Sequence, residues 1–411
     1  MLRKLTVQGF KSLRNVTVEF PRMSVLFGPN AAGKSNLLDA IQALSRIGTR
    51  RTIADALTEP IRGYPIESFS FPSGGLAELL SAPSASFSLE ADLTRRKDDY
   101  RYRIEVSIAP GSGALSVQDE YLTGLNRERT PKGNAAIEQV EGKLRVRRRG
   151  ESGKPRYELL GLNYAIASDP RLGKPLYPAI EAARAELSDW RTYYLDPRVA
   201  MRAAKPPSDV RDIGVLGGDV APFLYRLRGD DEKRYRAVAR TLRSIIPSVE
   251  EVSVDLDKRR GSLDLLVRQG GVDYSSRIVS EGTLRVLALC AITVNPWGGS
   301  LIAFEEPENG VHPRRLELIA QLLLSLALEQ GRQVVVTTHS PLFCEAVLKA
   351  AKANPGDIGL FNVRRDGTET VVQPFDVSGP LFTDHEIAAA LTTGSEDGLF
   401  ESLLLRGLLD E

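Results

Sequence analysis

One short segment near the start of the chain constrains the fold most. Residues 28–35, Gly-Pro-Asn-Ala-Ala-Gly-Lys-Ser, match the pattern G-x-x-x-x-G-K-[ST] at every fixed position. In such a loop, small residues let backbone N–H groups surround phosphates, and the next helix points the positive end of its dipole at them. A buried apolar run (25–27) precedes the loop, and helical periodicity follows it from 36 to 47. The sequence therefore predicts a strand–loop–helix unit that binds ATP through its phosphates.

Two side chains of this loop have defined expected roles. Lys34 is expected to bridge the β- and γ-phosphates, and the Ser35 hydroxyl to bind Mg²⁺. The residues that we expect to contact ATP here are Gly28, Pro29, Asn30, Ala31, Ala32, Gly33, Lys34, Ser35 and Asn36.

A second apolar run, residues 301–304, ends in Glu305-Glu306-Pro307-Glu308. Mg²⁺ prefers hard oxygen ligands, so we assign Glu305 to the metal. A second carboxylate can orient or deprotonate an attacking water, and we assign Glu306 to that role. The alternative is a solvated acidic turn before a helix, whose first turn also favours Glu.

The three histidines have different contexts. His339 follows the strand-like run 334–338, where it could donate a hydrogen bond to a γ-phosphate or be merely structural. Because it comes after the Glu-bearing strand, we predict the phosphate role and count His339 with Lys34 and Glu306 as catalytic. His312 is expected to position the helix that begins beside it, and His385 is expected at the surface.

Residues 280–284, Ser-Glu-Gly-Thr-Leu, open an apolar helix. A serine and exposed N–H groups at a helix start form an anion site, whereas the simpler interpretation of Ser280 is an N-cap alone.

The order of patterns predicts a nucleotide domain split by an insertion. Two strands (5–10 and 13–20) join around Lys11-Ser12, and strand–helix units return after residue 280. Between them, 49–85 looks irregular, 86–165 antiparallel, and 176–250 mostly helical, with strands at 252–257 and 263–268. We divide the chain into an N-terminal head part, a β-rich lobe, a helical insertion, a C-terminal head part and an acidic tail, at 1–48, 49–170, 171–245, 246–380 and 381–411.

Overall composition says little about partners. Lys and Arg number 54 against 53 acidic residues, so only local clusters matter: seven basic residues between 143 and 156, and a second set between 95 and 103. These clusters could hold DNA phosphates or be solvated charges on hairpins, with equal weight. Cys290 and Cys344 are expected as buried thiols. We see no membrane-spanning run and no signal peptide, and expect a cytoplasmic protein.

In this order, segments 28–35, 280–283 and 305–306 with His339 resemble the ATPase heads of the ABC superfamily. Within it the chain is most similar to the RecF, SMC and overcoming-lysogenization-defect (OLD) group, especially OLD-like bacterial "AAA family ATPase" proteins. The opening 7–13 and the Glu-Glu-Pro-Glu segment with His312 carry further likeness. The resemblance implies an α/β P-loop NTPase of the ABC-head type, with a mixed β-sheet split by a β-rich and helical insertion.

The resemblance also implies how the head works. In that family two heads pair head to tail around two ATP molecules, so Ser280 and Gly282 would act in trans on ATP held by the partner, with His339 acting in cis. Lys11 would approach the phosphates from the first turn. Glu305 stands where the family usually has aspartate, so its Mg²⁺ contact would run through water. The family's glutamine loop is not identified; residues 193–197 are a candidate region.

The sequence therefore predicts an ATP-hydrolysing switch or motor that forms a homodimer or higher oligomer. Its setting would be DNA maintenance or anti-phage defence. Long heptad arms are absent, and too few residues follow His339 for the Toprim nuclease of full OLD proteins, so a separate effector protein is expected. The alternatives are a scaffold that binds ATP without hydrolysis and, less favoured because of the long insertion, a transporter subunit.

Overall fold

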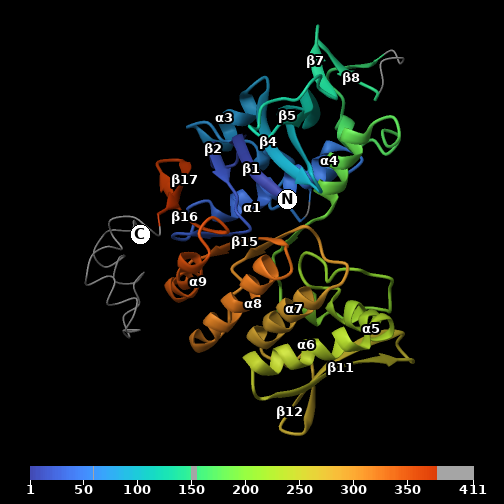
Figure 1. The fold of residues 1–411 in the computed structure, drawn as a ribbon, viewed down its shortest axis with the longest axis vertical. Coiled ribbons are helices and arrows are strands. Elements are labelled where there is room, and N and C mark those ends of the chain that lie inside the picture. The colour runs from blue at the N-terminus through green and yellow to red at the C-terminus, as the bar shows by residue number, and fades with distance from the viewer. Residues whose placement is uncertain (59, 150–154, 377–411) are drawn as a thin grey trace, which may run out of the picture. The chain divides into compact units, whose positions relative to one another are not determined.

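The computed structural model describes residues 1–58, 60–149 and 155–376 (Figure 1). Contacts divide the chain into two compact units. Unit 1 comprises Met1–Pro21, Pro29–Trp190 and Asn362–Gln373; unit 2 comprises Arg22–Gly28, Arg191–Phe361 and the described residues from Pro374 on. Each unit is therefore built from separate stretches of the sequence. The predicted five-part division by role remains a prediction.

Unit 1 contains an eight-stranded antiparallel sheet. Its order is β2-β1-β4-β5-β6-β7-β8-β9. Alternate residues of β1, such as Leu5 and Val7, are buried, as the period of a half-covered strand requires. The first two strands thus share one sheet with the β-rich lobe. The strands are β1 (Leu2–Phe10), β2 (Leu13–Glu19), β4 (Ala85–Arg95), β5 (Asp98–Ala109), β6 (Ala114–Leu125), β7 (Ile137–Val140), β8 (Lys143–Val146) and β9 (Arg156–Leu159).

The helices of unit 1 include elements that the sequence did not suggest. The expected helix after the glycine-rich loop is α1 (Lys34–Ile47). The region 49–85, predicted as irregular, also holds α2 (Ile53–Ala56), the 3₁₀ turn η1 (Pro65–Ser68) and α3 (Gly75–Ser81). Local capping explains α2, because the Thr52 side chain accepts a hydrogen bond from the Asp55 N–H. Further along lie η2 (Ile166–Ser168) and α4 (Pro178–Ser188).

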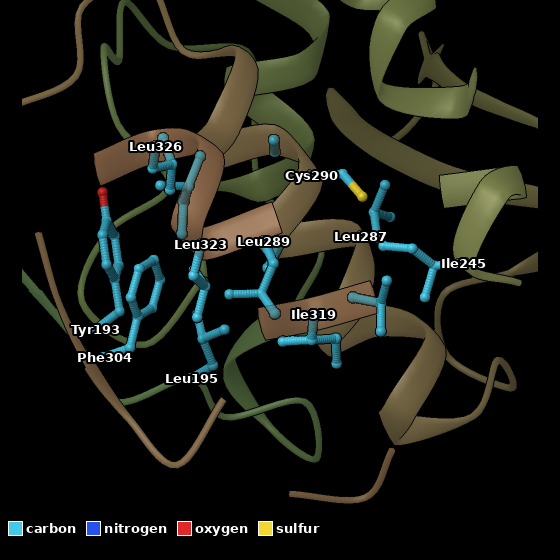
Figure 2. Packing of buried hydrophobic residues seen from close by; sticks show 14 of the residues in the cluster. Tyr193, Leu195, Ile245, Leu287, Leu289, Cys290, Phe304, Ile319, Leu323 and Leu326 are labelled. Atoms are coloured by element: carbon cyan, nitrogen blue, oxygen red, sulfur yellow. The ribbon is translucent and has the colours of Figure 1, made fainter. Parts of the chain in front are cut away.

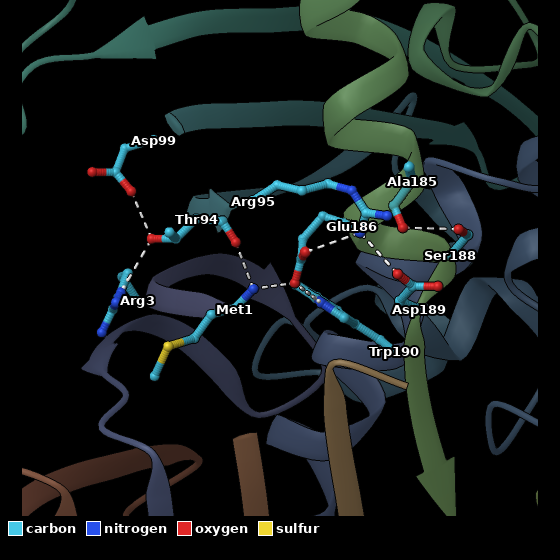
Figure 3. A network of polar contacts seen from close by, with 10 residues as sticks. All are labelled: Met1, Arg3, Thr94, Arg95, Asp99, Ala185, Glu186, Ser188, Asp189 and Trp190. Atoms are coloured by element: carbon cyan, nitrogen blue, oxygen red, sulfur yellow. Dashed lines mark hydrogen bonds and ion pairs between the residues drawn. The ribbon is translucent and has the colours of Figure 1, made fainter. Parts of the chain in front are cut away.

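One buried carboxylate ties α4 to two other segments of unit 1 (Figure 3). Glu186 accepts hydrogen bonds from the Met1 amino group and, at 3.2 Å, from Arg95. The Trp190 indole N–H lies 3.3 Å from the same carboxylate. Burial lowers the pKa of the Met1 amine. The network fixes the start of β1 and the end of β4 on this helix.

Unit 2 holds most of a six-stranded sheet of order β10-β14-β15-β3-β16-β17. Strands β14, β15 and β3 are parallel neighbours, and all three are buried along their length except at Glu305, as expected for strands covered on both faces. The strands are β3 (Met23–Phe27), β10 (Trp190–Tyr193), β14 (Leu301–Glu305), β15 (Gln333–Thr338), β16 (Ile358–Asp366) and β17 (Glu369–Phe375).

Helices of unit 2 pack in the series α6, α7, α8 and α9. In the core (Figure 2), Leu289 of α7 lies near Leu323 of α8, and the Tyr193 ring stacks on Phe304 with centroids 5.4 Å apart. A three-stranded sheet, β11-β12-β13, packs on α5 and α6. The elements are η3 (Ala200–Arg202), α5 (Val220–Asp230), α6 (Glu232–Ile245), β11 (Val249–Asp257), β12 (Ser262–Gln269), β13 (Val272–Ser275), α7 (Glu281–Val294), η4 (Pro313–Arg315), α8 (Leu316–Leu328) and α9 (Pro341–Ala353).

Some sequence expectations differ from this fold. The stretch 176–250 is less helical than predicted, since 194–219 is mostly irregular and rich in Pro and Gly. Cys290 and Cys344 are buried free thiols, as predicted. None of the described helices is long and apolar enough to cross a membrane. His385 and the acidic tail at 381–411 lie outside the described residues.

Candidate functional site

The glycine-rich loop has the backbone shape that its sequence suggests. Gly33 has φ 105° and Ala31 has φ 64°, both in the left-handed region, and α1 begins at the next residue, Lys34. Only glycine enters this region without strain, so Ala31 carries a cost of about 1 kcal/mol or more. A Cβ on Gly33 would lie 2.0 Å from Thr370 Oγ1. Glycine is therefore required at position 33 by both conformation and space.

The loop is braced by three side chains, of which the sequence analysis missed Thr370. Thr370 of β17 is buried and donates a hydrogen bond from Oγ1 to the Ala32 carbonyl at 2.9 Å. The Ser12 hydroxyl lies 2.7 Å from Thr370 Oγ1 and accepts from Asn36 Nδ2, also at 2.7 Å. No local pattern marks Thr370, because it comes from far along the sequence. These contacts hold the loop and the first turn of α1 in a fixed shape.

Two lysines of unit 1 have defined partners. Lys34 is buried, and its Nζ donates to the Pro29 carbonyl across the loop at 2.8 Å. Lys11 Nζ lies 2.6 Å from Asp39, a fully buried carboxylate of α1 that also receives Arg62 at 3.0 Å. The predicted approach of Lys11 to phosphates remains a prediction, since its ammonium here pairs with Asp39.

A cavity of about 600 Å³ lies beside the loop within unit 1. Its lining includes Lys11, Arg62, Arg365 and Asn36, with one carboxylate, Glu67. A pocket lined by several cations suits an anionic ligand such as a phosphorylated molecule.

In unit 2, three strand ends meet at one edge of the parallel sheet. Glu305 pairs in register with Thr337, and Thr337 pairs with Leu26. The carboxyl ends of parallel neighbours point the same way, so Glu306, His339 and Gly28 leave the sheet from one edge. Gly28 is the first residue of the glycine-rich loop. The predicted acidic pair, the histidine and the start of the loop therefore share this edge.

The carboxylate of Glu306 is held on both oxygens. Asn309 Nδ2 donates to Oε2 at 2.6 Å, and His339 Nδ1 lies 3.2 Å from Oε1. The backbone of Glu306 has φ 43°, an unfavourable value for a residue with a Cβ, and its N–H donates to the Thr337 carbonyl at 3.0 Å. Strained residues of this kind cluster at functional sites. Asn309 was not singled out from the sequence, although its position three residues after Glu306 is a local signal.

A second carboxylate here, Glu308, is nearly buried. One oxygen accepts from the Thr338 hydroxyl and from the His339 N–H, whereas Oε2 has no hydrogen-bond partner among the described residues. Burial raises its pKa. Arg285 of α7 is electrostatically coupled to it, and its Nε likewise lacks a described hydrogen-bond partner. Burial lowers the pKa of Arg285 despite the nearby carboxylates. The sequence analysis assigned no role to Glu308 and did not single out Arg285.

The segment at the start of α7 is built for close packing. The Ser280 hydroxyl caps the helix by accepting from the Thr283 N–H at 3.2 Å. A Cβ on Gly282 would lie 2.2 Å from the Gly310 carbonyl oxygen, so glycine lets the two backbones touch. The N-cap interpretation of Ser280 is thus realised; the roles of Ser280 and Gly282 toward ATP remain predictions. His312 similarly caps η4, accepting from the Arg314 N–H at 3.3 Å.

The residue types predicted to bind Mg²⁺ are chemically suitable. Ser35 of unit 1 and Glu305 of unit 2 each carry a hard oxygen donor, the ligand type that Mg²⁺ requires, and their use by one ion remains a prediction. Within the described residues no group of three or more His, Cys, Asp or Glu side chains could form an all-protein metal site. A few protein ligands completed by phosphate and water match how Mg²⁺ usually binds in nucleotide sites.

Several basic side chains of the two predicted clusters form ion pairs with nearby carboxylates. In the cluster at 95–103, Arg101 pairs with Asp92 at 2.7 Å and Arg103 with Asp119 at 2.6 Å, which leaves Arg96 and Lys97 exposed on the turn. In the cluster at 143–156, Glu138 receives both Arg145 and Arg147. Residues 150–154 of that cluster lie outside the described chain. Much of the predicted charge is therefore balanced internally.

Comparisons with known proteins agree with this architecture. Residues 23–345 match the family model described as "AAA domain, putative AbiEii toxin, Type IV TA system". The chain is 44% identical over 55 residues to the DNA replication and repair protein RecF of Lactobacillus acidophilus, which is 13% of this chain and 15% of that protein. The chain thus matches only a small part of that relative.

Solved structures resemble it over more of its length. An SMC head domain with an extended coiled coil from Pyrococcus furiosus, bound to the C-terminal domain of ScpA, aligns with a TM-score of 0.54 at 12% identity. That alignment covers 94% of this chain and 99% of the other. The SMC head domain from Thermotoga maritima aligns with a TM-score of 0.43 at 14% identity, covering 91% and 99%.

Proposed function

The chain belongs to the AAA domain family whose model spans residues 23–345, and has the fold of an ABC-type P-loop head; from this premise we propose that it binds and hydrolyses ATP. The observation that carries the proposal is the parallel register of β14, β15 and β3, from whose common edge Glu306, His339 and Gly28 depart. A catalytic carboxylate, a histidine and a phosphate loop are the parts that such chemistry needs together.

The proposed roles follow from the chemistry of each side chain. Backbone N–H groups of residues 28–36 hold the phosphates, and Lys34 neutralises them after leaving the Pro29 carbonyl. Ser35 and Glu305 would hold Mg²⁺, which would neutralise charge on the transferred phosphoryl group. Glu306, fixed by Asn309, orients and deprotonates the attacking water. His339 donates to the γ-phosphate.

The first test measures ATP turnover of Glu306→Gln against the parent chain. Loss of the base should lower turnover by about 100-fold or more while ATP binding persists. Glu317→Gln, which neutralises an exposed carboxylate at the start of α8, is the matched control and should turn over normally. Equal turnover in the Glu306 variant would remove the proposed base. No turnover in the parent chain, with ATP bound, would favour the alternative of a non-hydrolysing scaffold.

We further propose that two heads pair on ATP, with Ser280 and Gly282 contacting the nucleotide of the partner. The test is light scattering on Glu306→Gln with and without Mg-ATP, which should show an ATP-dependent shift from monomer to dimer. Ser280→Asp is the sharp variant, because aspartate keeps the N-cap acceptor of α7 but brings a negative charge to the triphosphate. It should fold normally and stay monomeric. Dimerisation of Ser280→Asp would exclude the contact in trans.

The setting that we propose is control of DNA or of a separate effector protein, in DNA maintenance or anti-phage defence. Support comes from the short match to a protein named for DNA replication and repair. A membrane protein co-purifying with the chain would instead favour the transporter alternative. A DNA-stimulated rate of ATP hydrolysis would support the DNA setting, and a rate indifferent to DNA would direct the search to a protein effector.

A further inference from the structure

A second cavity, remote in sequence from the glycine-rich loop, lies in the β-rich part of unit 1. Its volume is about 500 Å³, within the range of small-ligand sites. Three consecutive arginines, Arg147, Arg148 and Arg149, line it together with the first turn of α4. No carboxylate of the described residues lines this cavity, so its charge is strongly positive.

Hydrogen bonds join the arginine run to other segments of unit 1. The Arg147 N–H donates to the Ala136 carbonyl at 2.9 Å, and the Arg149 N–H donates to the Leu176 carbonyl at 2.8 Å. Arg148 Nε lies 3.1 Å from the hydroxyl of the buried Tyr177. The two backbone bonds hold the arginine run in place, and the Arg148 contact holds one of its guanidinium groups against Tyr177, the residue before α4.

Two of the three arginines that line the cavity, Arg148 and Arg149, form no ion pair with a carboxylate of the described residues, whereas Arg147 does. Glu138 is the carboxylate that Arg147 contacts, at 2.9 Å, and it is shared with Arg145 at 2.6 Å. The guanidinium groups hold the pKa of Glu138 below its usual range, so it stays ionised. Against that single carboxylate stand four arginines. Arg148 and Arg149 are both exposed.

The helix adds donors of the same kind. Ala179 and Ile180 line the cavity from the first turn of α4, where N–H groups have no carbonyl partner within the helix. Pro178 occupies the first position, where its missing N–H costs nothing. Guanidinium forks and free backbone N–H groups together are the donor set that proteins use for phosphate.

We propose that this cavity binds a phosphate group carried by a ligand, at a site separate from the ATP site. Guanidinium pairs match phosphate oxygens in a bidentate manner, and the cavity offers little aromatic surface for reading a base. The chemistry fits a phosphate of a nucleic-acid strand or of a free phosphorylated small molecule. This inference does not depend on ATP hydrolysis by the chain.

The test uses the full chain carrying Lys34→Ala, so that the glycine-rich loop does not bind the probe. The probe is a ten-residue oligothymidine labelled at its 3′ end, with either a 5′-phosphate or a 5′-hydroxyl, followed by fluorescence anisotropy. Inorganic pyrophosphate serves as competitor. Arg148→Ser with Arg149→Ser should weaken binding by about tenfold or more. The matched control removes two cations elsewhere in the same sheet, Arg96→Asn with Lys97→Ser, and should leave binding within about twofold.

Each outcome decides something. Weakened binding of both oligonucleotides supports the site and identifies the internal phosphodiester as its ligand, whereas weakened binding of the 5′-phosphate form alone supports the site for a terminal phosphate. Pyrophosphate bound by the parent and lost in the double variant, without oligonucleotide binding, supports a small-molecule ligand. If neither probe is affected, or if the control pair weakens binding equally, the proposal is overturned. The single variant Arg149→Ser leaves the Arg148–Tyr177 contact in place. Weaker binding by this variant would therefore not come from loss of that structural contact.

Discussion

Two buried glutamates, one in each unit, show how differently a fold can treat the same side chain. Glu120 of β6 accepts from the Ile166 N–H at 2.6 Å, the Ala167 N–H at 2.8 Å and the Tyr102 hydroxyl at 3.0 Å. Glu308 beside the acidic strand end keeps one oxygen without a described hydrogen-bond partner. Burial raises the pKa of both.

The difference teaches where function is to be sought. Each oxygen of Glu120 is satisfied, as is usual for a carboxylate that joins two parts of a structure. The orphan oxygen of Glu308 costs stability, and it faces the same neighbourhood as Arg285, whose Nε is also unsatisfied. Groups left unsatisfied in a native protein call for an explanation, and rearrangement of the site during the proposed ATP hydrolysis would provide one.

The largest expected effect comes from removing the satisfied carboxylate. Glu120→Ala leaves two backbone N–H groups and the Tyr102 hydroxyl buried without an acceptor, which should cost roughly 3 kcal/mol or more of the free energy of unfolding. Hydrogen exchange at the Ile166 and Ala167 amides measures the loss locally. Unchanged protection of both amides would mean that Glu120 does not hold this turn.

The pH dependence of the same group gives the next effect. Burial raises the pKa of Glu120 to about 7 from 4.5, so the folded state holds a proton over this range that the unfolded state has released. Its contribution to stability is therefore greatest below pH 4.5 and falls as pH rises toward 7, by roughly 3 kcal/mol in total. Glu120→Gln should flatten this part of the stability curve. An identical slope in that variant would assign the pH dependence to other groups.

Replacing glutamate by glutamine should change the free energy of unfolding in opposite directions at the two sites. Glu120→Gln places amide hydrogens against a backbone N–H donor and should destabilise by about 1 to 2 kcal/mol at pH 8. Glu308→Gln removes a charge that burial disfavours while Oε1 can still accept from Thr338 and His339, and should stabilise by about 1 kcal/mol. Chemical denaturation of both variants checks this. Destabilisation by both would contradict the contrast between the two carboxylates.

The smallest effect concerns a strained residue of the phosphate loop. Ala31→Gly relieves the left-handed backbone at φ 64° but adds freedom to the unfolded chain. These two effects oppose each other, and we expect the free energy of unfolding to rise by less than about 1 kcal/mol. Gly33→Ala is the contrasting variant, because its Cβ would strike Thr370, and it should be clearly destabilising. Thermal unfolding of the two variants, compared with the parent, gives the measurement.

Local patterns explain what the sequence analysis could reach. The phosphate loop, the acidic strand end and the start of α7 are each defined by a few consecutive residues. The order of these segments along the chain indicated the fold class. The family model and the SMC-head likeness support that fold. The assignments of Lys34, Glu306, His339 and Ser280 to steps of ATP chemistry remain predictions.

What could not be predicted depends on contacts between distant segments. Thr370 braces the loop at Ala32 from more than three hundred residues away. Arg285 and Glu308 influence each other electrostatically because the fold brings α7 close to the strand end, and no spacing in the sequence marks the two residues. The arginine cavity requires the end of β8 and the start of α4 to meet. Counting basic residues along the sequence also does not show which of them form ion pairs. Cross-strand partners such as Asp119, which neutralises Arg103, become visible only in the fold.

The two cysteines have a practical consequence for following the proposed assembly. They are the only ones in the sequence, both are buried, and burial raises the pKa of Cys290, so neither thiol should react readily with a maleimide dye. Ile278, two residues before Ser280, is 71% exposed. The variant Ile278→Cys would therefore carry a single reactive position without any need to remove native cysteines. Energy transfer between donor- and acceptor-labelled chains would then report, in real time, when two copies meet and part.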